Sequence, residues 1–331
     1  MTNHHPFIAR SSLTVLAAAL ALADYANAAP YPERAVTWVV PFSAGGPADV
    51  LARNIAAKVA ENLGQPIVID NTGGAGGTIG AAKVAKSKND GYTFLLGHVG
   101  QMAAAPYLYK KLPYDPIKDF EPVFRLPYTP LILLVGVNSP FKNVEQLIAA
   151  AKAKPGSINF GNAGVGSTSH LVAALFAQQA GINITSISYK GAGPAMVDVV
   201  SGRIDAMFDQ SNSSLPQVTA GRARALAQSG AKRMPQFSAV PTVSESTIPH
   251  FAAVTWYGLY APHGTPVAAL ATMNTAYRKA IGDSSLRDRL SKQGVQLLQD
   301  EEYSAAALKK LNADELVRWK DVITQTRITA E

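Results

Sequence analysis

The 331-residue sequence contains no cysteine. Disulfide bonds, thiol nucleophiles and thiolate metal sites are therefore excluded. Charged side chains are also sparse, at 16% of all residues, whereas 47% are hydrophobic. A chain of this length and composition can bury the cores of two domains, and it depends on those cores because no covalent cross-link is available.

The motifs of common catalytic and cofactor sites are missing as well. A dinucleotide-binding fingerprint that begins at Gly74 reaches Gly76 but has Ile79 where its third glycine belongs. No glycine-rich loop ends in Gly-Lys-Ser/Thr, and no serine has the two flanking glycines of a nucleophile elbow. The histidines are spread singly, without the spacing of a metal site. We expect no cofactor and no metal, and a binding protein rather than an enzyme.

One catalytic alternative stays open. Ser167 and His170 lie three residues apart at a predicted helix start. A serine at such a position most often caps the helix, but the two side chains could also form a catalytic pair. An exported enzyme, whose catalytic site would be the cleft in which a binding protein holds its ligand, is therefore the alternative from a different functional class.

Long hydrophobic runs are limited to one, at residues 13–23. Arg10 precedes it, and Ala26-Asn27-Ala28 follows as a cleavage signature. The run is short for a bilayer span, so an uncleaved anchor or a core helix is the weaker interpretation. We expect a signal peptide over residues 1–28, whose cleavage releases an exported mature protein that starts near Ala29.

Lysine and arginine outnumber the acidic residues and give a net charge of +7. The basic residues are scattered, and the densest sites are only pairs, Lys110 with Lys111 and Arg222 with Arg224. Such a distribution does not form a basic face with interleaved aromatics, so we expect no nucleic-acid partner. The charge either steers acidic small molecules toward a cleft or is simply solvated surface.

The region 36–64 combines a buried strand, a loop of small residues and a helix. Residues 36–40 are apolar, and Gly45 and Gly46 lie in the loop that follows. Leu51, Ile55, Val59 and Leu63 then recur every four residues until Gly64 provides a helix stop. The loop is either an ordinary turn or an anion site, because unpaired N–H groups and the positive end of the dipole lie at a helix N-terminus.

The same strand–loop–helix pattern recurs along the chain. Further strands are predicted at 67–69, 92–96, 131–135, 157–160, 184–189, 206–209, 225–227 and 254–260, with helices between many of them. A second loop rich in glycine and hydroxyl groups, 161–170, precedes a helix that ends at Gly181. Apolar strands alternating with helices predict parallel sheets covered on both faces, and ligands of such sheets bind at the strand ends.

Several segments together resemble the Bug family, the periplasmic receptors of tripartite tricarboxylate transporters. They are PFSAGGPAD (41–49), GAGGTIG (74–80) after Asn71, DGYT (90–93), LYKKLPYDP (108–116), YKG (189–191), LA (226–227) and VPTV (240–243). The resemblance covers nearly all of the mature chain. It implies an α/β fold of the type II periplasmic-binding-protein class, with two β/α lobes around a ligand cleft. We expect residues 29–130 plus 252–331 to form one lobe and residues 131–251 the other.

The resemblance also implies a carboxylated ligand, held by backbone N–H groups and hydroxyls from both lobes, partly through ordered water. The residues that match the family pattern are Phe42, Ser43, Ala44, Gly45, Asn162, Gly164, Ser167, Thr168, Tyr189, Gly191 and Asp209. Phe42 and Tyr189 would be apolar walls. Asp209 would suit a hydroxylated or amine-bearing ligand and repel a second carboxylate, or it could merely cap a strand end.

Two segments depart from the family pattern. Thr72 and Gly73 replace the frequent Arg-Pro after Asn71, and His98 starts a segment that is commonly small and hydroxyl-rich. His98 could reach the far end of the ligand or could be a lone, internally satisfied histidine.

The function implied is capture of a di- or tricarboxylate or a related organic acid. The expected partners are the ligand and the membrane subunits of a tripartite transporter, and the receptor is expected to be a monomer. A ligand-sensing receptor for a membrane signalling partner is a further alternative.

Overall fold

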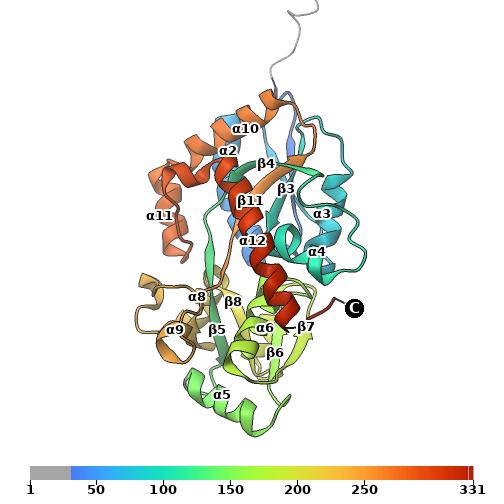
Figure 1. Ribbon diagram of the computed structural model, residues 1–331. Coiled ribbons are helices and arrows are strands. Elements are labelled where there is room, and N and C mark those ends of the chain that lie inside the picture. The colour runs from blue at the N-terminus through green and yellow to red at the C-terminus, as the bar shows by residue number, and fades with distance from the viewer. Residues whose placement is uncertain (1–30, 327, 331) are drawn as a thin grey trace, which may run out of the picture.

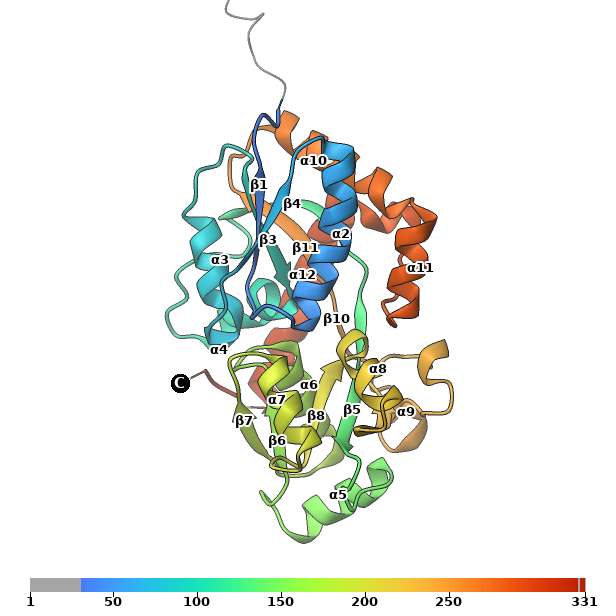
Figure 2. The same cartoon turned by 180° about the vertical axis from the view of Figure 1, so that it is seen from behind.

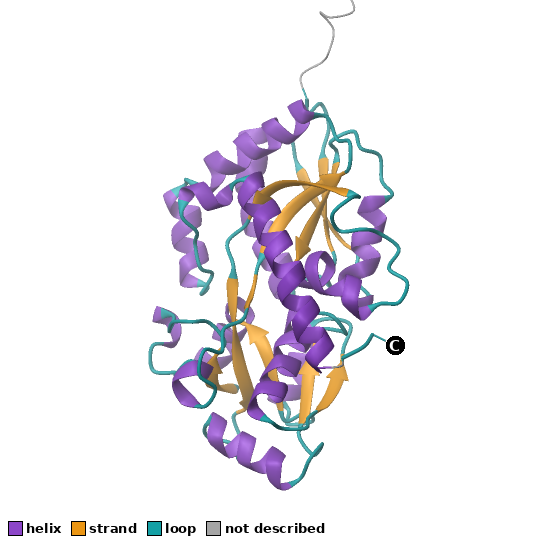
Figure 3. Ribbon diagram, viewed as in Figure 1, coloured by secondary structure: helices purple, strands orange, loops and turns teal. Residues whose placement is uncertain are grey.

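The computed structural model describes residues 31–326 and 328–330. The chain forms two sheets, one above the other in the view of Figure 1, and helices flank each sheet (Figure 3). The predicted signal peptide, residues 1–28, lies outside the described part. Within that part, no helix combines the length and the apolar character needed to cross a membrane.

The upper lobe contains a five-stranded sheet of order β2-β1-β3-β11-β4. Its strands are β1 (Val36–Val40), β2 (Ile67–Asn71), β3 (Thr93–His98), β4 (Phe120–Arg125) and β11 (Tyr257–Pro262). One face packs on α2 (Pro47–Leu63), α10 (Val267–Ile281) and α11 (Ser284–Lys292). The other face packs on α3 (Thr78–Ala85), α4 (Ala105–Leu108) and α12 (Ala305–Thr326). Each face therefore has its own buried core.

The lower lobe contains a six-stranded sheet of order β10-β5-β8-β6-β7, with β9 also paired to β5. Its strands are β5 (Thr129–Gly136), β6 (Asn159–Asn162), β7 (Thr185–Ser188), β8 (Ala206–Gln210), β9 (Ala223–Gln228) and β10 (Val254–Thr255). The helices α5 (Val144–Ala153), α6 (Thr168–Ala180) and α9 (Val243–Ser246) cover one face. The helices α7 (Ala192–Val200) and α8 (Ser211–Thr219) cover the other.

The prediction of wholly parallel sheets is wrong. Strand β1 runs parallel to β2 and β3, and β6 runs parallel to β7 and β8. However, β11 is antiparallel to β3 and β4, and β5 is antiparallel to β8, β9 and β10. Both β5 and β11 are buried along their whole length. A continuous apolar run reports burial on two faces, and it carries no information about strand direction.

The strand predicted at 254–260 is divided between the two lobes. Strand β10 pairs with β5 in the lower sheet, and β11 pairs with β3 and β4 in the upper sheet. Trp256 lies between them, and its indole N–H donates to Glu315 of α12 at 2.9 Å. Together with residues 126–128, which join β4 to β5, this crossing connects the lobes. Helix α12 packs on β4 and also contacts α6, so it lies against both lobes (Figure 1).

Local helix signals are confirmed at several positions. Gly64 adopts the left-handed conformation after α2, and Asn143 caps α5 by accepting from the Gln146 N–H. Strand β4 and helix α8 were not predicted from the sequence.

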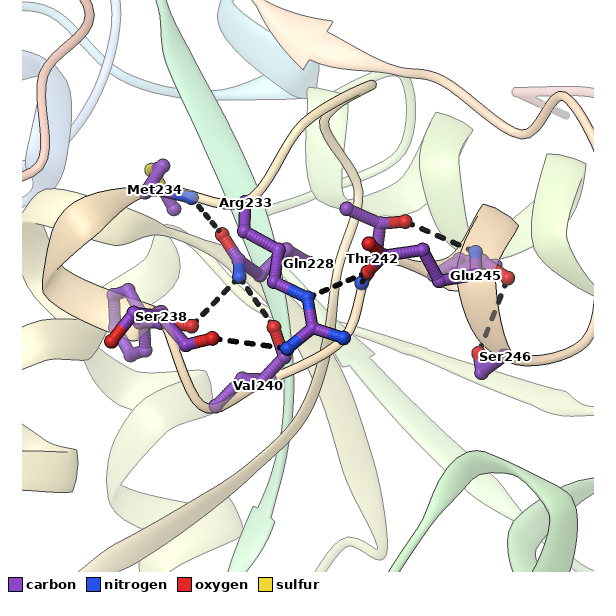
Figure 4. Close-up of polar contacts among 10 residues, drawn as sticks. Gln228, Arg233, Met234, Ser238, Val240, Thr242, Glu245 and Ser246 are labelled. Atoms are coloured by element: carbon purple, nitrogen blue, oxygen red, sulfur yellow. Dashed lines mark hydrogen bonds and ion pairs between the residues drawn. The ribbon is translucent and has the colours of Figure 1, made fainter.

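The proline-rich stretch 234–249, predicted as a crossing loop, is folded around one buried side chain. Gln228 donates to the carbonyls of Phe237 and Val240 at 2.9 and 2.6 Å and accepts from the Met234 N–H (Figure 4). Thr242 and Glu245 form a capping box at the start of α9. These contacts, together with a β-bridge between Gln228 and Thr242, satisfy several backbone groups of this segment.

Candidate functional site

A cavity lies between the two lobes, where the loop after β1 faces the loops of the lower sheet. The side chains and backbone that line it come from both lobes: Phe42, Ser43, Gly46, Pro47, Ala48, His98, Leu131, Ala163, Ser167, Thr168, Ser169, Ala192, Asp209 and Gln210. Figure 2 shows α2 rising along the upper sheet from the junction of the lobes, with α7 and α8 below that junction.

Four helices begin at this cavity. The first residues of α2, α6 and α7 line it, as does Gln210, which precedes α8. A helix N-terminus carries a partial positive charge and unpaired N–H groups. No lysine or arginine is among the described residues that line the cavity, and Asp209 is the single carboxyl group there. The positive potential therefore comes from backbone dipoles.

The loop before α2 is held by a buried carboxylate. Asp49 accepts from the Gly45 N–H at 2.8 Å, from Arg53 Nε at 2.9 Å and from Asn71 Nδ2 at 3.0 Å. Asn71 Nδ2 also donates to the Phe42 carbonyl at 3.1 Å. Burial alone would raise the pKa of Asp49, but these hydrogen bonds outweigh it and lower the pKa below its usual value. The loop is thereby fixed by a carboxylate whose charged form is favoured by its partners.

The loop before α6 is held by neutral groups. Ser167 caps the helix by accepting from the His170 N–H, and Ser167 Oγ lies 3.0 Å from Ser169 Oγ. Ser169 Oγ accepts from the Ala163 N–H at 2.9 Å. The hydroxyl of Thr168 is buried and has no hydrogen-bond partner in the described part of the chain. It is a polar group at the cavity that is left for a ligand or water.

The predicted alternative pair of Ser167 and His170 has a capping geometry. His170 Nδ1 accepts from the Gly166 N–H at 3.2 Å, and burial lowers the pKa of the imidazole to about 4. The Ser167 hydroxyl contacts the backbone of His170, and its other partner is Ser169.

His98 lies at the end of β3 on the upper side. Phe42 stacks on its ring with a centroid distance of 4.8 Å, and the Tyr257 ring lies edge-on at 6.0 Å. Its Nδ1 accepts from the Gly100 N–H at 2.6 Å. Burial lowers the pKa of His98 to about 3, so the ring is neutral at physiological pH.

Asp209 lies on the lower side, at the end of β8 and just before α8. Ser213 Oγ donates to its carboxyl group, and the Ser214 hydroxyl donates to its carbonyl at 3.2 Å. Burial raises the pKa of Asp209 to about 6, and the hydrogen bonds from Ser213 and the Gln210 N–H offset only part of that effect. The carboxyl is thus tied to the following helix, as the capping interpretation expects, and it also lines the cavity. Its role toward a ligand stays a prediction.

Comparison with known proteins assigns the chain to a family. The tripartite tricarboxylate transporter family receptor, TctC, matches residues 51–328. The chain belongs to this family. BugT of Bordetella pertussis is 34% identical over 314 residues, which are 94% of this chain and 95% of BugT. The predicted Bug-family resemblance is thus confirmed, and the protein is a solute-binding receptor.

Solved structures of related proteins share the fold. A Rhodopseudomonas palustris protein with adipate has a TM-score of 0.86 at 36% identity, covering 90% of this chain and 99% of that one. MatC from Rhodopseudomonas palustris with bound malate has a TM-score of 0.85 at 38% identity, covering 88% of this chain and all of that one. The predicted periplasmic-binding-protein fold is confirmed.

Half of the residues predicted for the receptor's site line the cavity. They are Phe42, Ser43, His98, Ser167, Thr168 and Asp209. The other six do not line it: Ala44, Gly45, Asn162, Gly164, Tyr189 and Gly191. Gly45 uses its N–H on Asp49, and Asn162 accepts from the Gly164 N–H at 2.9 Å, so these three groups shape the loops.

Tyr189 and Gly191 have partners other than the cavity. The Tyr189 hydroxyl donates to Asp198 at 2.7 Å. Gly191 precedes α7 and faces Ser43 of the upper lobe, where an added Cβ would overlap the Ser43 hydroxyl. Ala44 is exposed beside the cavity.

The two lobes of the receptor touch directly around the cavity. Asn212 Nδ2 donates to the Pro47 carbonyl at 3.0 Å, and Ser211 Oγ donates to the Gly294 carbonyl at 2.8 Å. Gly76 lies so close to Val165 that a Cβ on it would overlap the Val165 carbonyl oxygen. In the described conformation the two lobes are therefore in direct contact at the cavity.

Some functional residues were missed from the sequence. Asp49 was part of the opening motif but was given no role, although an acidic residue in the first turn of a helix is a recognisable capping signal. Asn71 and Gln101 act through partners that are distant in sequence, and Gln210 marks the start of a helix that was not predicted. The partners of these three side chains are the Phe42 carbonyl, the Gly76 carbonyl and the Tyr257 hydroxyl, and no local sequence pattern reveals them.

Proposed function

We propose that this receptor captures a carboxylated small molecule, a di- or tricarboxylate or a related organic acid, and delivers it to the membrane subunits of a tripartite transporter. One observation carries the proposal: four helix N-termini meet at a cavity that is lined by no lysine or arginine of the described chain. Such an arrangement suits an anion that is held by N–H and hydroxyl donors.

The grip on the carboxylate involves both lobes. Because α2 begins at Pro47, the N–H groups of Ala48 and Asp49 have no partner within the helix. The N–H groups of Thr168 and Ser169 likewise lack partners within α6, because they belong to its first turn. The Thr168 hydroxyl adds a further donor without a partner in the described chain. The adipate and malate in the related structures are both carboxylates, which supports the same class for this receptor.

The twelve predicted residues divide into two groups in this proposal. Phe42, Ser43, His98, Ser167, Thr168 and Asp209 contact the ligand directly or through water. Ala44, Gly45, Asn162, Gly164, Tyr189 and Gly191 shape the loops and the contact between lobes. The expected lobes, residues 29–130 plus 252–331 and residues 131–251, need one adjustment in this proposal, because β5 begins at Thr129 and β10 pairs with it in the lower sheet. We therefore place the lobe boundaries, and the closing movement, at the two connections, residues 126–128 and Trp256.

The test is thermal unfolding of the mature protein with a panel of mono-, di- and tricarboxylates that includes succinate, malate, adipate and citrate. A ligand at 100 times its Kd adds about 2.7 kcal/mol to the free energy of unfolding. A clear upward shift of Tm with at least one acid is expected. If every member of a broad panel leaves Tm unchanged, the ligand is not a carboxylate.

Further measurements separate the alternatives. Recovery of the bound acid without chemical change distinguishes a receptor from an exported enzyme. Neighbouring genes for two membrane subunits favour transport over sensing. N-terminal sequencing of exported protein is expected to begin near Ala29, and light scattering is expected to give a monomer mass.

A further inference from the structure

The ring of His98 is held in one orientation. Phe42 covers one face at an interplanar angle of 12°, and the Tyr257 ring is nearly perpendicular, at 80°. The side chain is buried and lines the cavity. Packing against Phe42 and Tyr257 therefore blocks rotation of the imidazole ring about its Cβ–Cγ bond.

The hydrogen bond to Gly100 fixes which ring nitrogen carries the proton. The Gly100 N–H points at Nδ1 from 2.6 Å. A backbone amide can only donate, so Nδ1 must be the acceptor and the proton must lie on Nε2. In the other tautomer, an Nδ1–H group and the Gly100 N–H group would point at each other across 2.6 Å.

The Nε2–H group then lacks a partner. Its polar neighbour is Gln101 Nε2 at 3.4 Å. Gln101 is oriented by the backbone at both ends, because its Oε1 accepts from the His98 N–H at 3.2 Å and its Nε2 donates to the Gly76 carbonyl at 2.8 Å. The neighbouring nitrogen is therefore a donor, and no described side chain accepts the Nε2 proton.

We propose that the Nε2–H of His98 donates to an oxygen atom of the bound solute and thereby helps to select it. The inference rests on the proposed capture of a carboxylated ligand. A buried donor with no acceptor is costly, and a ligand oxygen removes that cost. A donor at His98 disfavours a cationic group on this side, so an amino group of the ligand would be directed toward Asp209.

The ring acts as a neutral donor, not as a cation. Burial lowers its pKa, and a hydrogen bond with the His98 backbone offsets only part of that effect. The Gly100 N–H would also oppose a proton on Nδ1. The other titratable groups around it are Tyr257, whose pKa is raised by burial, and Asp209 across the cavity. Neither supplies a close acceptor to the ring.

Two substitutions separate the roles of the two nitrogens. His98→Asn keeps an acceptor near the Nδ1 position for the Gly100 N–H but has no donor at the Nε2 position. His98→Gln keeps a donor near Nε2 and loses the acceptor. His250→Asn is a matched control, because His250 is exposed and its left-handed φ of 64° is one that asparagine tolerates.

Affinity is measured by calorimetry for the tightest binder among succinate, malate, adipate and citrate. We expect His98→Asn to weaken binding about 10-fold or more, since the acceptor is charged. His98→Gln should retain more affinity than His98→Asn, and His250→Asn should be unchanged. Unchanged affinity in His98→Asn would overturn the inference, whereas failure of the wild type to bind any of the acids would instead remove the proposed function.

Nitrogen-15 NMR of histidine-labelled wild type provides a readout that does not depend on variant folding. The His98 signals are assigned by their loss in His98→Asn. We expect a neutral ring with the proton on Nε2 from pH 5 to 8, and a shift of that N–H when the acid is added to saturation. A proton on Nδ1, a charged ring or an N–H signal that does not move would contradict the inference.

Discussion

Each side of the cavity contains a buried aspartate beside a helix N-terminus, and the two behave oppositely. Asp49 of the upper lobe is 3% exposed and Asp209 of the lower lobe is 2% exposed. The pKa of Asp49 is lowered, whereas burial raises the pKa of Asp209 to about 6. Partners make the difference, since Asp49 has a guanidinium, an amide and an N–H around it and Asp209 has a hydroxyl and one N–H.

The difference assigns separate tasks to the two sides. Asp49 is saturated by its own chain, so it fixes the backbone of the loop before α2 and has no acceptor left for a solute. Asp209 keeps its carboxyl at the cavity with few partners, and the unpaired Thr168 hydroxyl lines the same cavity. The upper side is thus pre-organised, and the lower side is able to respond to the ligand.

Replacement of Asp49 should have the largest effect on stability. Asp49→Ala leaves Arg53, Asn71 and the Gly45 N–H without their shared acceptor, and we expect a loss of about 3 kcal/mol in the free energy of unfolding. Because Arg53 is half exposed, most of this loss comes from the buried amide and N–H. Urea denaturation measures the loss. Asp49→Asn, which keeps an acceptor, should lose less, and equal losses would mean that charge alone matters.

Closure of the two sides is tested by a pair of glycines with the same backbone strain. Gly76 and Gly181 both have φ of 62°, but an added Cβ meets the Val165 carbonyl only at Gly76. Both alanine variants should lose about 1 kcal/mol of stability. Only Gly76→Ala should also weaken ligand binding, by about 100-fold or about 2.7 kcal/mol, because the clash exists only between closed lobes. Equal affinity in the two variants would show that the Gly76 contact does not limit closure.

Asp209 should make stability fall as the pH rises. Its folded-state pKa of about 6 lies above the unfolded value of about 3.9. Its contribution is therefore fully present below pH 4 and is lost as the pH rises through 6, by about 2–3 kcal/mol. Asp209→Asn removes this dependence.

The comparison of wild type and Asp209→Asn by thermal unfolding tests that sign. The variant should gain stability relative to wild type at pH 7.5 and not at pH 4.5. For Asp49 the sign is reversed, because its contribution is present above the unfolded pKa and is lost only as the pH falls below about 4. A constant difference between the two proteins across this range would mean that Asp209 titrates normally.

The free hydroxyl of the lower side should give the smallest effect. Thr168→Val removes a buried group that has no partner in the described chain, so stability without ligand should stay the same or rise slightly. The binding free energy for the carboxylate that binds most tightly should weaken by about 1 kcal/mol. Ser167→Ala serves as a comparison, since it removes a helix cap and should lower both stability and affinity. A Thr168→Val variant that binds as well as wild type would remove this hydroxyl from the site.

Several helix ends and loops were predictable because the sequence signals that mark them are local. Gly64 and Asn143 mark helix ends through their own backbone preference and side chain. The glycine- and hydroxyl-rich loops at 42–46 and 161–170 do precede helices that begin at the cavity. Strand direction was not predictable, because the buried runs in β5 and β11 would look the same in either orientation.

The site itself was predictable only in part. Gly45 was expected to offer an N–H to the ligand, but that N–H is taken by Asp49 in an arrangement completed by Asn71 from the next strand. The division of 254–260 at Trp256 was also missed, because the strand pairs with different sheets on its two sides. Such facts depend on partners far apart in the chain.

The sequence by itself determined the family, most of the strands and helices, and the loops that face the cavity. These features follow from composition, periodicity and motifs that span only a few neighbouring residues. Tertiary structure alone decided which donors remain free. The Nε2–H of His98 remains available because the Gln101 amide beside it is already paired with the distant Gly76 carbonyl. The hydroxyl of Thr168 has no partner in the described chain, although the neighbouring hydroxyls of Ser167 and Ser169 pair with each other. Hydrogen-bond capacity is shared among groups that folding brings together, and a sequence shows which groups exist but not which of them are already paired.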